Sequence, residues 1–200
     1  MTIVLLLFAL CSAAPPQSPR EQVRTLIEEF EAALDAPKDL AQATRLEGLL
    51  ARIEAYTRVE PEFLDEHLMV NARMLAWYRG VDVRPDVIIA HAMTLVNAER
   101  QVVPDARAAS PRSPVGDPTR GPDPVARPVA GRTDDVERRR ELRKKYAEDF
   151  VLAYLDLARA LERAGRVPEA LRWLDVGESR VFDLPDALPR IRAERARLRG

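Results

Sequence analysis

Apolar side chains recur at intervals of three or four residues over most of this chain, which is the spacing of one face of an α-helix. Before the first apolar series, Ser18, Pro19 and Glu21 have the pattern of a capping box with proline at the first helical position. The series predicts a helix that ends before Pro37. Its apolar positions are Val23, Leu26, Ile27, Phe30, Ala33 and Leu34.

Proline and glycine residues mark the ends of the helices that follow. A second apolar series runs from Leu46 to Tyr56 and stops before Pro61, so we expect it to fold back on the first helix. Pro61 and Pro85 then open two more helices. Gly80 lies between these helices, and we expect it to end the first of them in the left-handed conformation.

These four helices predict two αα-hairpins, at residues 20–58 and 61–101. Together they form a predicted N-terminal unit, residues 18–103. No segment alternates apolar and polar residues over a strand's length between turn pairs such as Asn-Gly. We therefore expect an all-α fold.

Residues 104–133 have a different composition. Seven of the chain's 16 prolines and three of its eight glycines fall there, with no aromatic residue. Such a segment buries too little apolar surface to offset the entropy of ordering, so we expect a Pro-rich, disordered linker. A Pro-rich stretch is also a ligand for aromatic-lined grooves, and the plain spacer is the favoured interpretation.

Beyond this linker, residues 134–199 form a predicted C-terminal unit. One long helix is expected from about Asp134 to Ala164, and its first half, Glu137 to Lys145, is dense in charge. Acidic residues balance the basic ones there, so we favour a solvated helix face with ion pairs four residues apart over a phosphate-binding run. The arginine-rich segment from Asp186 predicts a polar final helix that caps the unit.

Within this C-terminal unit, residues 150–185 resemble a tetratricopeptide repeat. The segment Tyr154 to Leu161 is similar to the first helix of that repeat, and Gly165 falls at its turn. Glu169-Ala170-Leu171 matches the start of the second helix, whereas Pro185 lies about three residues later than the family's final proline. The resemblance implies αα-hairpins stacked on one another and a protein-binding role.

The N-terminal residues have the pattern of an export signal. An unbroken apolar run from Ile3 to Leu10 is too short to span a bilayer and is followed by small residues. We expect a signal peptide at residues 1–13, with the mature chain beginning at Ala14, and hence a periplasmic or secreted protein of a bacterial envelope. Lipidation of Cys11 is the alternative, although Leu10 is large for the position before a lipidated cysteine.

Composition narrows the functional classes. The chain has 200 residues, is 46% hydrophobic and 32% charged, and carries a net charge of −1. This balance argues against nucleic acid as a partner. Two histidines and one cysteine leave almost no material for a His/Cys metal site or a Cys-His nucleophile, and no cofactor-binding motif occurs. We expect no catalysis and no cofactor.

The two histidines carry the remaining chemical alternatives. His67 follows the acidic residues Glu62, Asp65 and Glu66, but no second histidine lies four residues away as in a zinc-binding helix. His91 lies in a helix that is apolar on nearly all sides, and we expect it to bond a backbone carbonyl. An enzyme or metal-binding module that uses either histidine stays open as an alternative.

We therefore favour an exported helical-repeat scaffold that binds a protein or peptide of unknown identity. In the resembled family, ligands lie against the first helices of the hairpins. An envelope-attached structural protein, held by a lipid on Cys11 or by the arginine-rich C-terminus, is the alternative. The helical spacing assigns Leu157, Ala158, Leu161 and Ala164 to the buried face. The predicted binding residues point outward from it: Leu155, Arg159, Glu162 and Arg163.

Overall fold

The computed structural model describes residues 18–58, 60–102, 131–181, 183–184 and 186–200. Every regular element in these ranges is a helix, which confirms the all-α prediction. In chain order they are α1 (Pro19–Leu34), α2 (Leu40–Thr57), the 3-10 turn η1 (Pro61–Phe63), α3 (Leu64–Tyr78), α4 (Pro85–Val102), α5 (Gly131–Lys145), α6 (Ala147–Arg163), α7 (Val167–Arg180) and α8 (Ala187–Arg199).

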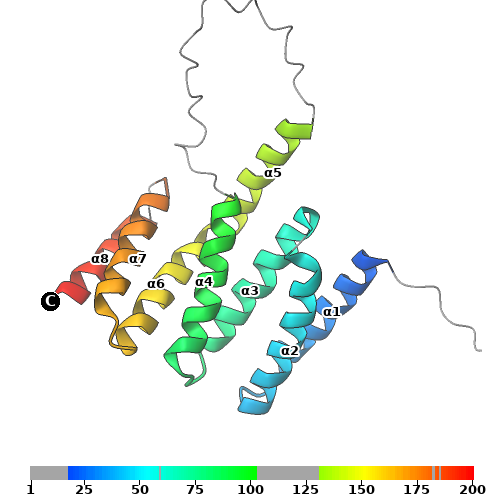
Figure 1. The fold of residues 1–200 in the computed structure, drawn as a ribbon, viewed down its shortest axis with the longest axis horizontal. Coiled ribbons are helices and arrows are strands. Elements are labelled where there is room, and N and C mark those ends of the chain that lie inside the picture. Colours follow the sequence, from blue (N-terminus) through cyan, green and yellow to red (C-terminus); the bar gives the residue numbers. More distant parts are fainter. Residues whose placement is uncertain (1–17, 59, 103–130, 182, 185) are drawn as a thin grey trace, which may run out of the picture.

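The helices pack as antiparallel neighbours in chain order. Helix α1 packs on α2, α3 on α4, and α6 on α7, while α8 covers both α6 and α7. In Figure 1, α2, α4 and α7 lie in front of α1, α3, α6 and α8. Direct contacts between α3 and α6 and between α6 and α8 run along this rear layer.

Local sequence explains several helix ends. The Ser18 hydroxyl accepts from the Glu21 amide at 3.3 Å and the Glu21 carboxylate accepts from the Ser18 amide at 2.8 Å, so the predicted capping box is confirmed. Gly165 has φ +74°, and the amides of Gly165 and Arg166 both bond back to the last turn of α6 at 2.8 Å. The left-handed conformation predicted for Gly80 is wrong, because its φ is not positive.

The core consists of two neighbouring clusters of buried residues, and the partly buried Met69 and Ile88 pack against both. One cluster lies between α1, α2 and α3, and Phe30, Leu46 and Ile53 are fully buried in it. A second cluster joins α3 and α4 to α6, α7 and α8. The predicted N-terminal and C-terminal units, 18–103 and 134–199, therefore bury their apolar side chains against each other.

The long helix predicted from Asp134 to Ala164 occurs as two consecutive helices. Tyr146 separates α5 from α6, yet its amide bonds Leu142 and its carbonyl accepts from Phe150, both at 3.0 Å. The helical hydrogen bonding thus passes through the junction. Figure 1 shows that the first part of α5 projects beyond the other helices.

Three predictions concern residues that the structure does not describe. The signal peptide at 1–13 and Cys11 lie outside the described residues. Most of the predicted linker, 104–133, also lies outside them, except that α5 begins at Gly131 and so includes its last three residues.

Candidate functional site

The predicted binding residues on α6 lie in two different environments. Arg159 and Arg163 are exposed and Glu162 is partly exposed, whereas Leu155 is only 3% exposed, so its predicted outward orientation is wrong. Helix α6 packs against α3, α4, α7 and α8. Because neighbours surround it on several sides, Leu155 is buried although it lies outside the single apolar stripe of the helix. Ala164, by contrast, is exposed at the end of the helix and does not belong to the buried face.

Arg159 and Arg163 line the same hollow, which lies between α3, α4 and α6 and has a volume of about 330 Å³. We call it the α3–α6 pocket. Its charged lining consists of three arginines and one aspartate, and its apolar lining comes from α3, α6 and the start of α4. The lining residues are Leu75, Tyr78, Arg79, Val81, Ile88, Asp156, Arg159, Ala160 and Arg163.

Arg79 crosses from the end of α3 to α6. Its Nε lies 2.6 Å from a carboxylate oxygen of Asp156, which is buried at 8% exposure. Burial raises the pKa of Asp156, and the Arg79 guanidinium opposes that shift. Sequence reasoning missed this pair, because 77 residues separate its members and no pattern links them.

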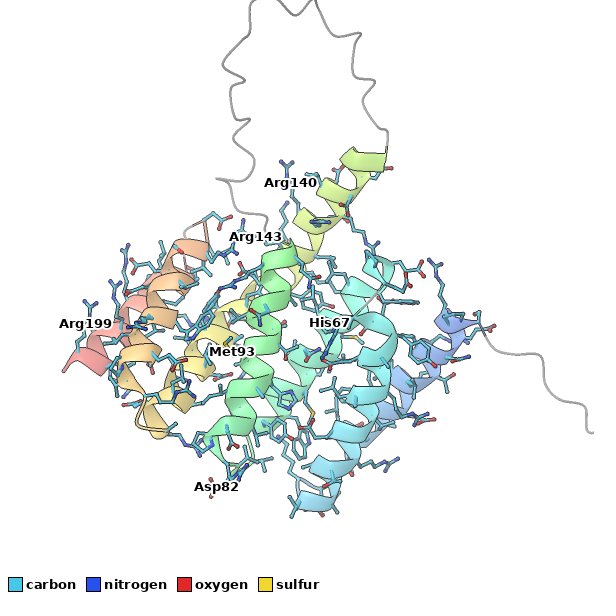
Figure 2. The ribbon with its side chains drawn as sticks, in the orientation of Figure 1. His67, Asp82, Met93, Arg140, Arg143 and Arg199 are labelled. Carbon is cyan, nitrogen blue, oxygen red and sulfur yellow. The ribbon has the colours of Figure 1, made fainter. Side chains whose placement is uncertain are left out.

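The two predicted arginines use only part of their hydrogen-bonding capacity. Arg159 donates to Glu194 on α8 at 3.1 and 3.4 Å, and Arg163 donates to the Val83 carbonyl at 2.9 Å. Asp82, which Figure 2 shows at the loop between α3 and α4, lies 3.8 Å from Arg163. A guanidinium has five N–H donors, so further donors of both side chains remain for an anion in the pocket.

Glu162, the fourth predicted residue, is tied to the final helix. It accepts from Arg197 at 3.0 and 2.5 Å, and this bonding lowers the pKa of the Glu162 carboxyl. Three other arginines of α8 bond in the same way. Four of the five donate to carboxylates on α6 or α7 in these pairs: Arg190 with Glu148, Arg192 with Glu178, Arg195 with Asp175, and Arg197 with Glu162. The arginine-rich C-terminus is thus largely neutralised within the fold.

The charged run of α5 bonds mainly to other elements. Arg139 pairs with Asp135 four residues away, as predicted for a solvated face. Arg143, however, donates to the carbonyl of Arg180 at the end of α7 at 2.8 Å. Lys145 pairs with Asp65 on α3 at 2.7 Å. Most of the run is solvent-exposed, as predicted, but several of its basic side chains bond to other elements rather than to residues four apart.

The two histidines, which carry the remaining chemical alternatives, lie in different environments. His67 is buried, its Nδ1 lies 3.3 Å from the Thr57 hydroxyl, and burial lowers its pKa. The expectation of a backbone carbonyl at His91 is wrong, because its Nε2 lies 2.8 Å from a Glu47 carboxylate oxygen. Tyr78 donates to the same oxygen at 2.5 Å.

No group of three metal-binding side chains occurs within the described ranges. The helices of those same ranges include none that is both long and apolar enough to cross a membrane. Comparisons of the chain with protein-family models, curated proteins and solved structures found no match.

Proposed function

We propose that this chain is a helical scaffold that binds an acidic protein or peptide segment at the α3–α6 pocket. The observation that carries the proposal is the convergence of Arg79, Arg159 and Arg163 on one hollow. Among the described residues that line it, one carries a carboxylate, Asp156. A carboxylate of the partner accepts charge-assisted hydrogen bonds from these guanidinium groups. An adjacent apolar side chain of the partner lies on the apolar wall of the pocket.

The architecture supports this reading. Peptide-binding helical scaffolds hold their partners on surfaces that several stacked helices share, and the α3–α6 pocket lies where two αα-hairpins meet. The resemblance of residues 150–185 to a tetratricopeptide repeat supports the same class of function. A single small molecule is a poorer match, because two of the three arginines are about half exposed and offer an open, charged rim.

The test uses a fluorescein-labelled peptide of alternating leucine and glutamate, with a leucine and glutamine peptide as its neutral counterpart. Fluorescence anisotropy measures binding to the full chain and to the double variant Arg159→Ala with Arg163→Ala. We expect the double variant to bind the acidic peptide about tenfold more weakly or worse, since charge-assisted hydrogen bonds are lost. The neutral peptide should bind weakly to both proteins.

A matched control removes the same charge elsewhere. Arg45 on α2 and Arg172 on α7 are exposed and do not line the pocket, so their double replacement by alanine should leave binding unchanged. Arg79 is kept in every variant, because its removal would leave the buried Asp156 without its partner. Equal binding by the Arg159/Arg163 variant and the wild type would show that the acidic segment binds elsewhere.

We also propose that the chain is exported, on the strength of the apolar run and the small residues that follow it. Mass spectrometry of the protein from an expressing bacterium reads the mature N-terminus. A chain that begins at Ala14 supports cleavage and release, and a lipidated Cys11 supports the envelope-attached alternative. A chain that retains Met1 contradicts both.

A further inference from the structure

The surface of α6 that borders the α3–α6 pocket continues toward the start of the helix. Figure 1 shows α3 and α6 side by side in the rear layer, and the two helices are in direct contact. Asp149 and Asp156 are seven residues apart, nearly two helical turns, so both lie on the side of α6 that faces α3. We call this surface the α3–α6 seam. It consists of Arg73, Arg79, Asp149, Leu152, Asp156 and Arg159.

The carboxylate of Asp149 is a charged group of the seam that the proposed acidic segment does not use. Asp149 is partly buried, and no described residue donates a hydrogen bond to it or forms an ion pair with it. Its oxygens reach the solvent, because the buried side-chain atoms that lack a partner in the described part of the chain belong to other residues. A bound partner can therefore contact this carboxylate directly.

Each charged neighbour that acts on Asp149 has an oppositely charged partner of its own. Burial raises the pKa of Asp149, and the attraction of Arg79 and Arg73 does not cancel this effect. When the neighbours' ion pairs are counted, Asp149 remains as one unpaired negative charge on the seam. The pairs are Arg79 with Asp156 at 2.6 Å, Arg73 with Glu31 at 4.0 Å and Arg190 with Glu148 at 2.7 Å.

The position of this charge specifies a second residue of the partner. Asp149 and Arg159 are ten residues apart on α6, so their Cα atoms lie about 15 Å apart at a rise of about 1.5 Å per residue. An extended chain spans about 13 Å in four residues, with alternate side chains on the same side. A residue four positions from the partner's acidic residue therefore reaches Asp149. A basic side chain at that position neutralises the unpaired carboxylate.

An apolar side chain lies on the seam between the two charges. Leu152 is partly exposed and packs against neither core cluster. Its place between Asp149 and Asp156 puts it under the middle of a segment that joins Asp149 to the pocket. Because alternate residues of an extended chain share a side, the partner residue midway between the two charged ones faces Leu152. An apolar residue there covers this leucine.

We propose that the segment bound at the α3–α6 pocket is extended and carries a basic residue four positions from its acidic residue, with an apolar residue midway. The acidic residue bonds Arg159 and Arg163, and the basic residue pairs with Asp149. This inference rests on the proposed binding of an acidic segment and narrows it to segments that carry both charges. It requires Asp149, whereas the acidic segment alone requires the arginines.

The experiment compares two fluorescein-labelled peptides of the same composition with blocked ends. One peptide has glutamate and lysine four positions apart with leucine midway, and the other has the glutamate and the lysine adjacent. Fluorescence anisotropy measures the binding of each peptide to the full chain. We expect the spaced peptide to bind about fivefold more tightly, since its lysine alone reaches Asp149 while the glutamate occupies the pocket.

Variants assign this difference to one carboxylate. Asp149→Asn should bind the two peptides equally. Glu137→Gln is the matched control, because it removes an exposed carboxylate from the first half of α5 and should preserve the difference. The peptide of alternating leucine and glutamate should bind Asp149→Asn at least as tightly as the wild type, because a like charge has been removed. This measurement shows that the pocket of the variant is intact.

Three results would overturn the inference and leave the acidic-segment site in place. The first is equal affinity of the wild type for the spaced and the adjacent peptide, and the second is a difference that persists in Asp149→Asn. The third is weaker binding of the leucine and glutamate peptide by Asp149→Asn, which would make Asp149 a structural residue of the pocket. If that peptide binds equally to the wild type and to the Arg159/Arg163 variant, the pocket is not the binding site and both proposals fail.

Discussion

Helices α5 and α6 are consecutive along the chain and are joined by Tyr146, but their surroundings differ. In α6, ten of the 17 residues are buried, and apolar side chains contact α4 on one side and α7 on the other. In α5, Leu142 is buried and the other described side chains are partly or fully exposed. Its contacts with neighbours are mainly hydrogen bonds from arginine and lysine. Helix α6 is held mainly by the burial of apolar side chains. Helix α5 is held mainly by hydrogen bonds that its arginine and lysine side chains donate to carbonyls and carboxylates of other elements.

This difference matters for the proposed binding site. The α3–α6 pocket is lined by two buried residues of α6, Asp156 and Ala160, and by its exposed arginines. The position of α5, in contrast, depends on a few polar contacts. We therefore expect changes in α6 to alter global stability, and changes in α5 to act locally.

The largest effect is expected in the core of α6. Leu161 is fully buried, so Leu161→Ala leaves a cavity between α6 and its neighbours and should lower the free energy of unfolding by about 3 kcal/mol. Urea denaturation followed by circular dichroism measures the change. Leu40→Ala is the control, because Leu40 is 84% exposed and its loss should cost less than about 0.5 kcal/mol. Similar losses in both variants would contradict the burial assigned to α6.

The next effect concerns the close approach of α7 to α6. A Cβ at Gly177 would lie 2.9 Å from the Tyr154 ring and 3.2 Å from Ile191 on α8, so Gly177→Ala should destabilise the protein by about 2 kcal/mol. The same change at Gly48, within α2, meets no atom within 4 Å and should stabilise it by about 0.5 kcal/mol. Thermal denaturation of both variants should give shifts of opposite sign. A rise for Gly177→Ala would show that the three helices are not this tightly packed.

A smaller effect is expected in α5. Arg143 donates to the Arg180 carbonyl and, at 2.6 Å, to Asp183, so Arg143→Ala should cost about 1 kcal/mol. Hydrogen exchange should show faster opening of α5 and of the end of α7, with little change in α1 and α2. Arg140→Ala, on the same helix without a partner in the described part of the chain, should change neither. Equal exchange in the two variants would indicate that α5 does not depend on this contact.

The contrast between α5 and α6 also explains what the sequence could predict. Apolar periodicity located the helices and the burial of Leu157 and Leu161, because one buried face imposes a local spacing. It failed for Leu155, because the number of helices that surround α6 is set by tertiary packing and not by its own pattern. The turn at Gly165 was expected from the resemblance of residues 150–185 to a tetratricopeptide repeat, and the chain turns there with a positive φ.

Charged residues were predicted less well. A run of arginines and carboxylates has the same appearance whether it is solvated or bonded to distant elements, as with Arg143 and Arg180, 37 residues apart. Arg79 and Asp156 illustrate the same difficulty in the α3–α6 pocket. That Arg159 and Arg163 lie close together could be predicted, because a spacing of four residues places both on one side of a helix. Local spacing is readable in a sequence, whereas a long-range partner is not.

The last and smallest effect concerns the buried carboxyl between α4 and α6. Glu99 is 2% exposed, accepts from Tyr154 at 3.1 Å and lies 3.7 Å from Arg180. Burial raises its pKa and the attraction of Arg180 offsets only part of this. At pH values between the unfolded and the folded pKa, the folded protein therefore holds a proton that the unfolded chain releases. The contribution of Glu99 to stability is therefore complete below its unfolded pKa and decreases as pH rises through the folded value.

Glu99→Gln keeps a neutral acceptor for Tyr154 at every pH. The variant and the wild type should have equal stability in acid, and the variant should become the more stable protein as pH increases, by less than the Arg143 change. Urea denaturation of both proteins at a series of pH values gives this difference directly, since all other groups titrate alike in both. A variant that is less stable than the wild type at neutral pH would show instead that attraction between Glu99 and Arg180 exceeds the cost of burying the charge.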